Sequence, residues 1–156
     1  MKQRWVGVSL LLMAAIALGS LREFLFVNVN YQIDHVNRAT PFSYAHSAFQ
    51  SRVAGWGTQA LVALKWSMAV AFILLMWALC LLLLRAYAAP RRLFLLVSAL
   101  FMLVPTAALL LHLLAYRAPL AEEASVNLLH AVQNPIVLVF LWVTLALFRP
   151  TAAQGG

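Results

Sequence analysis

Four apolar stretches, separated by more polar segments, organise the chain. They cover roughly residues 5–27, 59–84, 93–116 and 126–148. A helix needs roughly 17–25 predominantly apolar residues to cross the hydrocarbon of a bilayer, and inside the helix its backbone groups satisfy one another. The pattern therefore predicts an all-α integral membrane four-helix bundle. We expect one transmembrane domain over residues 1–150 and a disordered tail over residues 151–156.

The first apolar stretch is shorter than the others. Its uncharged part runs from Val6 to Leu21, after a basic start, and it contains several small residues near its end. These features are also typical of a cleavable signal peptide, which would leave three spans. Residues 24–27 continue the apolar character past Arg22 and Glu23. We therefore favour an uncleaved anchor whose helix continues beyond the membrane.

A long polar segment over residues 28–58 separates the first two stretches. It is rich in aromatic residues, which disordered linkers lack: Tyr31, Phe42, Tyr44, Phe49 and Trp56. We predict a structured loop on the membrane surface, with its rings at headgroup level and a short helix around residues 43–53.

Charge changes the picture only by setting an orientation. The chain is 65% hydrophobic and 10% charged with a net charge of +7, whereas soluble domains are about a quarter charged. Its basic residues lie at the ends of apolar stretches, so we predict no nucleic-acid site. One side of the predicted bundle collects Lys2, Arg4, Arg85, Arg91, Arg92 and Arg149, and the other collects Arg22, Arg38, Arg52 and Arg117. The excess of positive charge predicts cytoplasmic N and C termini and an extracytoplasmic loop between the first two helices.

Lys65 lies inside the second stretch, toward its predicted outer end. Ionisable residues within spans are costly and therefore point to function. One interpretation is that the long side chain reaches the interface and serves no further role. The other is an ion pair with Glu122, Glu123 or Asp34 across the outer mouth of the bundle.

His112 and His130 lie near the predicted outer ends of the third and fourth stretches. An antiparallel helix pair would bring them to a similar depth. Two histidines on neighbouring helices can hold haem or a metal ion. The alternative is packing or hydrogen bonding across the helices, which we take as the default.

Asn127, His130 and Asn134 follow one another at helical spacing, and Gln133 flanks them. At 100° per residue the first three fall on one face. We expect this polar stripe to face the bundle interior, where amides hydrogen-bond between helices.

Catalytic motifs are missing from the sequence. Neither a nucleophile elbow nor a zincin pattern occurs, and the one cysteine, Cys80, lies inside an apolar stretch. We therefore predict that the chain is not an enzyme and holds no cofactor or metal.

Two short stretches resemble a known family. Leu21-Arg22-Glu23-Phe24-Leu25-Phe26 resembles a signature at the end of the first span in exosortase system-associated membrane proteins of Bacteroidetes-type bacteria. Gln133-Asn134-Pro135 is similar to the glutamine–proline start of their last span. The chain departs from the family at residues 27–29, where tyrosine, aspartate and proline are usual, and at Asn134, which separates Gln133 from Pro135.

The resemblance implies a noncatalytic accessory protein of the bacterial inner membrane, beside an exosortase-like sorting enzyme that carries the nucleophile. Its partners would be the lipid bilayer and this integral-membrane protein. The candidate interaction residues are Arg22, Glu23, Tyr44, His46, Lys65, His112, Asn127, His130, Gln133 and Asn134. Two alternatives stay open: a haem- or metal-binding redox subunit using His112 and His130, and a transporter component lined by Lys65 and the polar stripe.

Overall fold

The computed structural model describes residues 2–115 and 119–147, and all regular secondary structure in them is α-helical. The elements are α1 (Lys2–Arg38), α2 (Ser47–Gln50), α3 (Thr58–Ala86), α4 (Arg91–Leu114), α5 (Pro119–Gln133) and α6 (Ile136–Leu147). The all-α prediction is confirmed for this part of the chain. The predicted tail over residues 151–156 lies outside it.

Helix length and composition confirm a multi-pass membrane protein. The helices α1, α3 and α4 are each long and apolar enough to cross a bilayer. Even α4, with 24 residues, is about 36 Å long, against a hydrocarbon core of about 30 Å. The helices α5 and α6 meet the same criterion only as a pair bent by 52°. Residues 2–115 and 119–147 thus hold three candidate spans, or four if the bent pair is one span.

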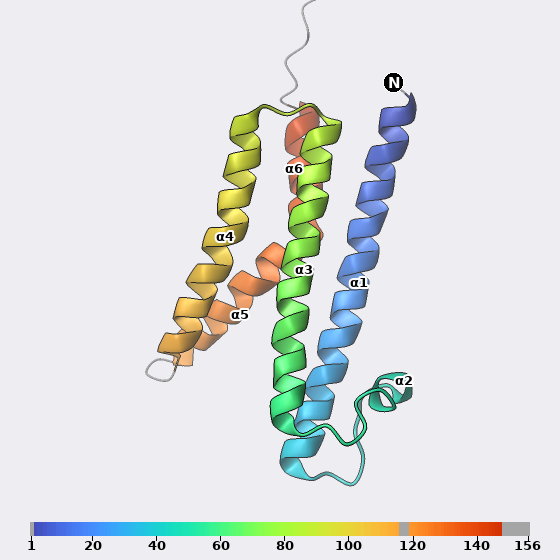
Figure 1. Ribbon diagram of the computed structural model, residues 1–156, viewed down its shortest axis with the longest axis vertical. Helices are drawn as coiled ribbons and strands as arrows, with labels where there is room; N and C mark the ends of the chain where they lie inside the picture. Colours follow the sequence, from blue (N-terminus) through green and yellow to red (C-terminus); the bar gives the residue numbers. More distant parts are fainter. Residues whose placement is uncertain (1, 116–118, 148–156) are drawn as a thin grey trace, which may run out of the picture.

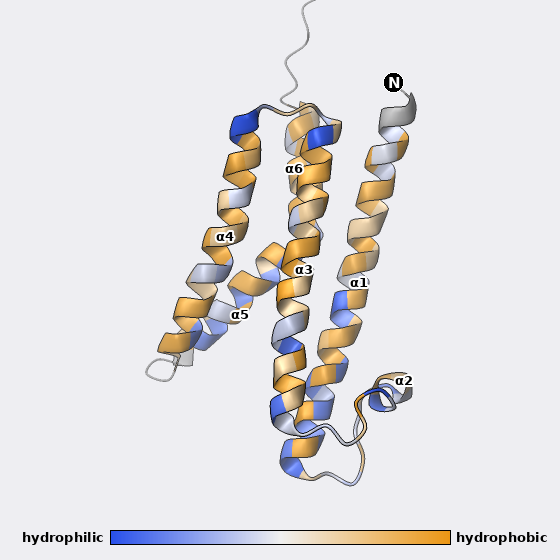
Figure 2. Ribbon diagram, in the orientation of Figure 1, coloured by the Kyte–Doolittle hydropathy of each residue, from blue (hydrophilic) through white to orange (hydrophobic). Residues whose placement is uncertain are grey.

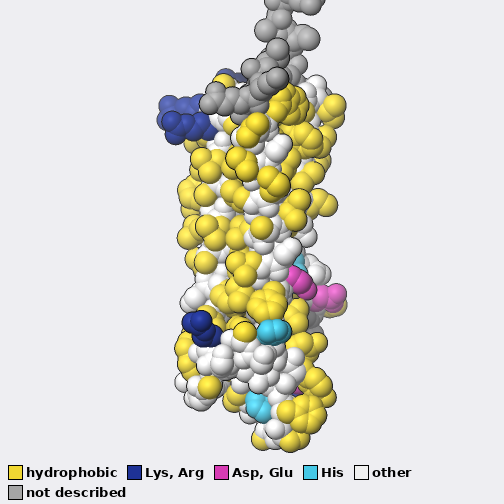
Figure 3. Space-filling model, turned by 90° about the vertical axis from the view of Figure 1, so that its right-hand side faces the viewer, with side chains coloured by type: hydrophobic (Ala, Val, Ile, Leu, Met, Phe, Trp, Pro, Cys, Tyr) yellow, Lys and Arg dark blue, Asp and Glu magenta, His cyan; other side chains and the backbone are white. Residues whose placement is uncertain are grey.

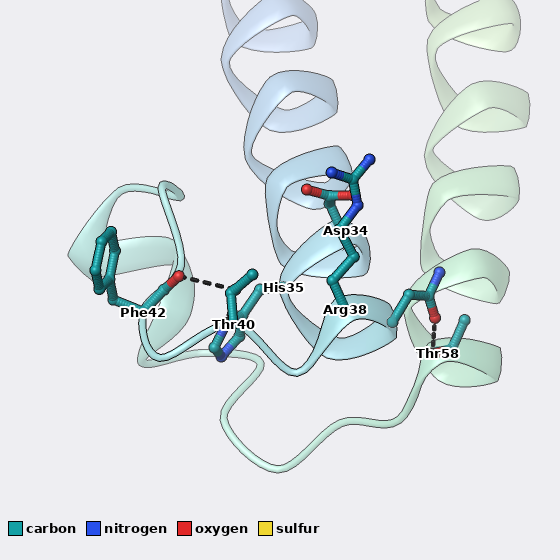
Figure 4. Close-up of polar contacts among 7 residues, drawn as sticks. Asp34, His35, Arg38, Thr40, Phe42 and Thr58 are labelled. Carbon is teal, nitrogen blue, oxygen red and sulfur yellow. Dashed lines mark hydrogen bonds and ion pairs between the residues drawn. The ribbon is translucent and has the colours of Figure 1, made fainter.

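The first helix is longer than the predicted span. It continues without interruption to Arg38, so residues 28–38, which were predicted as part of the loop, are helical. The expected continuation past the apolar stretch is confirmed. Its physical reason is local: residues 20–38 contain neither Gly nor Pro. An ion pair of 2.7 Å between Asp34 and Arg38 also joins successive turns (Figure 4).

The loop after α1 is folded against the helices. The helix ends where Ala39 takes a positive φ of 48°, a common way to stop an α-helix. The predicted short helix is present but spans only the four residues of α2. Phe49 and Val53 are buried with Val29 of α1 and Leu61 of α3 in an apolar cluster. The loop is therefore structured, as its aromatic content indicated.

The helices run between two ends of the molecule (Figure 1). The N-terminal end holds the start of α1, the turn between α3 and α4, and the end of α6. The loop end holds the α1–α3 loop with α2. In Figure 1, α1 lies beside α3, α5 crosses obliquely next to the loop-end half of α4, and α6 occupies the half nearer the N-terminal end. Hydrophilic residues mark both ends and interrupt α1 and α3 in the half nearer the loop end (Figure 2).

The predicted fourth span is not one straight helix. It begins earlier than expected, at Pro119, and breaks between Gln133 and Ile136. Pro135 explains the break, because it has no backbone N–H and disfavours helical geometry in the residue before it. The Asn134 Oδ1 accepts a hydrogen bond of 3.0 Å from the Ile136 N–H and so caps the new helix. The predicted fourth span over residues 126–148 is therefore broken within its length, and residue 148 lies outside the described part of the chain.

Candidate functional site

A chain of buried polar contacts joins three helices near the break. Arg22 of α1 is 7% exposed, and its Nε donates to the Gln133 Oε1 at 2.7 Å. The Gln133 Nε2 in turn donates to the Ala69 carbonyl of α3 at 3.1 Å. We call these three residues the polar junction. It satisfies both ends of the Gln133 amide and positions the end of α5 against α1 and α3.

Close approach of α1 to the break depends on Gly19, one turn before Arg22. A Cβ at this position would lie 2.4 Å from the Pro135 Cγ, which no real side chain tolerates. Only glycine therefore lets the α5–α6 break pack this closely against α1. The bend at Pro135 and the absence of a side chain at Gly19 together set the geometry of the polar junction.

The Arg22 guanidinium is only partly satisfied. Its Nη1 lies 3.7 Å from the Glu23 Oε2, but the Glu23 side chain is 70% exposed. The guanidinium carbon lies 4.9 Å from the centre of the Phe26 ring. Its Nη2 is buried and has no hydrogen-bond partner in the described part of the chain. Such a donor is costly unless something from outside the chain occupies it.

A cavity of about 430 Å³ adjoins the polar junction on the side of α4 and α5. We call it the polar cavity. All four long elements of this region, α1, α3, α4 and α5, contribute to its wall. Its ionisable lining residues are Arg22, Glu23, Lys65, His112, Glu122 and His130.

A second cavity, of about 530 Å³, lies at the break itself. We call it the break cavity. Its wall comes from residues 16–24 of α1 and from Gln133, Asn134 and Pro135. Arg22 and Gln133 line both cavities, so the polar junction separates them.

The structure gathers most of the ten candidate residues, but not all. The polar cavity brings together Arg22, Glu23, Lys65, His112, His130 and Gln133. Asn134 lines the break cavity. Tyr44 and His46 belong to the loop, and Asn127 is exposed on α5.

The predicted polar stripe does not face the interior. Asn127 and Asn134 are exposed, whereas Ser125 and Gln133 are 1% and 2% exposed. The Ser125 Oγ donates to the Ala108 carbonyl of α4 at 2.7 Å. The buried face of α5 is therefore centred on positions 125, 129 and 133. Sequence reasoning missed Ser125, although its spacing of eight residues from Gln133 places both on one helix face.

Lys65 makes none of the predicted ion pairs. No carboxylate of Glu122, Glu123 or Asp34 lies within 4 Å of its ammonium in the described residues, and Asp34 is paired with Arg38 instead. Lys65 and Glu122 nonetheless line the same cavity. The Lys65 side chain thus lines the cavity without an ion-pair partner among the described residues.

His112 and His130 line one cavity, as an antiparallel arrangement of their helices would allow. The His112 ring packs edge-on against Trp66, with centroids 5.1 Å apart. Among the residues described by the structure, no group of three or more His, Cys, Asp and Glu side chains is arranged to hold a metal ion. The contact with Trp66 supports a packing role for His112.

The loop is fixed to α1 by side-chain contacts. The Asn28 Oδ1 accepts a hydrogen bond from the His46 backbone N–H, and the His46 ring packs edge-on against Phe24 at 5.7 Å. Beyond α1, a hydrogen bond of 2.6 Å from Thr58 to Asn37 ties the start of α3 to the end of α1 (Figure 4). The loop therefore presents a defined surface.

That surface carries exposed aromatic rings. Tyr44 is 73% exposed and Phe42 is 60% exposed, and their rings meet at 5.5 Å. Tyr31 of α1 continues the group, 6.1 Å from Tyr44. We call these three residues the aromatic patch.

No family model, curated protein or solved structure matches this chain.

Proposed function

We propose that this chain is a noncatalytic accessory protein of an exosortase-type protein-sorting system in the bacterial inner membrane. The observation that carries the proposal is the hydrogen bond between Arg22 and Gln133. It joins the two short stretches that resemble the exosortase-associated family, although 111 positions separate them in the sequence. Two motifs that contact each other in the folded chain are expected to serve one function.

The proposed topology is a four-helix bundle in which α5 and α6 form a broken fourth span. Charge supports its orientation. Arg85, Arg91 and Arg92 cluster at the N-terminal end, and the excess of basic residues there favours the cytoplasm. On the face drawn in Figure 3, the larger group of Lys and Arg side chains lies near that end, basic side chains also occur toward the loop end, and hydrophobic side chains cover the middle. The loop end then faces the extracytoplasmic side.

The proposed docking surface joins the aromatic patch to the break cavity. Phe24 connects the two, because it packs on His46 of the loop and also lines the break cavity. Exposed aromatic side chains are enriched in protein–protein interfaces. Phe24 is 42% exposed and belongs to a helix long and apolar enough to cross a bilayer, so a partner that covers it lies in the membrane or at its surface. These contacts favour an integral-membrane partner.

In this proposal the sorting chemistry belongs to the partner. Cys80 is fully buried in an apolar cluster with Met76 and Leu83. A thiol in such surroundings is neither ionised nor reachable by a substrate. The chain instead contributes a shaped surface beside the partner's active site.

Site-specific photo-cross-linking in the native membrane tests the proposal. A photoreactive phenylalanine analogue replaces Phe24 or Tyr44, and the matched control replaces Leu110, which is 57% exposed on α4. We expect the first two positions to cross-link to one polytopic membrane protein with a catalytic cysteine, and the control position to cross-link to lipid only. Equal yields at all three positions, or a partner without a cysteine nucleophile, would contradict the proposal.

A further inference from the structure

The unpartnered Arg22 nitrogen points to a ligand that the chain does not supply. Three contacts of the guanidinium are accounted for: Gln133 accepts from Nε, Glu23 lies near Nη1, and the guanidinium carbon lies over the Phe26 ring. Both N–H groups of the buried Nη2 lack an acceptor among the described residues. Arginine offers such a pair of donors in a geometry that suits phosphate and carboxylate oxygens.

The charges around the polar cavity favour an anion. Arg22 is 93% shielded from solvent, whereas the two carboxylates that line the cavity, Glu23 and Glu122, are exposed. Lys65 lies on α3, whereas Arg22 lies on α1, and Lys65 has no ion pair in the described residues. Charges at the exposed rim are screened far more than a buried guanidinium. The two cations and the two carboxylates balance formally, but the most buried charge of the cavity is the Arg22 guanidinium, which an anion would contact.

Apart from Asn30, Ser125 and Gln133, the rest of the cavity wall is apolar, and it reaches the outer surface. Val27, Val62 and Trp66 line the cavity and are each 37% exposed. They belong to candidate membrane spans, so the cavity opens on the outer surface of helices that are apolar enough to cross a bilayer. The polar cavity is thus continuous with the lipid, which favours an amphiphilic ligand over a free ion.

The depth of the cavity fits a headgroup. Lys65 lies about 20 residues before Arg85 along α3, and His112 lies about 20 residues after Arg92 along α4. Both intervals correspond to about 30 Å of helix, which is the thickness of the hydrocarbon core. The cavity therefore lies where the phosphates of one leaflet begin.

We propose that the polar cavity binds the phosphate group of a phospholipid from the leaflet at the loop end. The Arg22 Nη2 and the Lys65 ammonium donate to phosphate oxygens, and an acyl chain leaves the cavity past Trp66 toward the membrane interior. Binding would also fasten α1 and α3 to the α4–α5 pair on the side of the cavity. The inference does not rest on the proposed function, because it concerns only this chain and its lipid.

Native mass spectrometry of the full chain in mild neutral detergent tests the inference. The probes are a short-chain phosphatidylglycerol, the diacylglycerol with the same chains but no phosphate, and inorganic phosphate. We expect the phospholipid to bind at one site. The other two probes should bind at least about tenfold more weakly, because each lacks either the charge-assisted bonds or the apolar contact.

Variants locate the site. Arg22→Gln should weaken phospholipid binding about tenfold or more, through loss of charge-assisted hydrogen bonds. Lys65→Gln serves as a second variant, because Lys65 makes no hydrogen bond or ion pair in the described structure whose loss would unfold the chain. It should weaken binding about threefold to tenfold. The matched control is Arg52→Gln on the exposed loop, which should change binding less than about twofold.

Three results would overturn the inference. The first is wild-type affinity in both Arg22→Gln and Lys65→Gln. The second is diacylglycerol binding as tightly as phosphatidylglycerol, which would mean a purely apolar groove. The third is inorganic phosphate binding as tightly as the phospholipid, which would mean an anion site without a lipid.

Discussion

The two halves of this molecule are held together by different kinds of contact. Toward the N-terminal end, apolar side chains interdigitate around Met76, Cys80 and Leu83, all fully buried. Hydrogen bonds between side chains of different elements on that side use tryptophan N–H groups, such as the bond of 3.0 Å from Trp142 to Tyr87. Toward the loop end, a buried guanidinium, a glutamine and a helix carbonyl form the polar junction, beside an open cavity.

These two kinds of contact predict where the fold depends on particular residues. Inside a bilayer, apolar packing gains little from the hydrophobic effect, because lipid chains are as apolar as leucine. A buried guanidinium such as that of Arg22 has few acceptable environments and so demands particular partners. We infer that the N-terminal half tolerates substitution, while the loop-end half depends on named residues.

Removing the Gln133 amide should produce the largest effect. Gln133→Leu leaves the Arg22 Nε unpaired and frees the Ala69 carbonyl, so we expect a loss of about 2–4 kcal/mol in the free energy of unfolding. Leu83→Ala, a cavity mutation in the N-terminal half, should cost about 1–2 kcal/mol, because only packing is lost there. Unfolding by a harsh detergent in mixed micelles measures both.

A double variant tests whether the cost of losing Gln133 comes from its contact with Arg22. Arg22→Leu with Gln133→Leu removes both partners, so its cost should be clearly smaller than the sum of the two single costs. Additive costs, or a larger cost for Leu83→Ala than for Gln133→Leu, would show that the polar junction is not what makes the loop-end half specific.

The two glycines of α1 described here allow a matched test at intermediate magnitude. Gly19→Ala places a methyl group 2.4 Å from Pro135, so the break must move, and we expect a cost of about 1–3 kcal/mol. Gly7→Ala meets nothing within 4 Å and should be neutral or stabilising by up to about 1 kcal/mol, from helix propensity. The same unfolding assay compares them, and equal effects would contradict the close approach at Gly19.

The smallest effect is expected at the loop. Asn28→Ala removes the acceptor of the His46 N–H and should cost about 1 kcal/mol. That cost should speed tryptic cleavage after Arg52 about fivefold, by opening the loop locally. Asn30→Ala, on an exposed position of the same helix, should leave the cleavage rate unchanged. A loop equally resistant in both variants would mean that Asn28 does not hold it.

Some residues of the site were predictable and others were not. Arg22, Lys65 and Gln133 stand out in the sequence, since polar groups in apolar stretches are rare. Ala69 could not be predicted, because it contributes only a carbonyl, which every residue has. Ser125 lay outside the predicted span and was missed for that reason. Asn127 was assigned to the interior because the buried face of the helix was inferred from too few polar residues.

The long apolar stretches are enough to predict a helical membrane protein. In lipid, such stretches can satisfy their backbone hydrogen bonds only as helices. Packing between helices is needed to explain the bend of 52° between α5 and α6, the fit of Gly19 against Pro135, and the contact of Arg22 with Gln133. Those outcomes depend on which faces of separate helices touch. Periodicity along one helix cannot specify that, since lipid and protein neighbours are almost equally apolar.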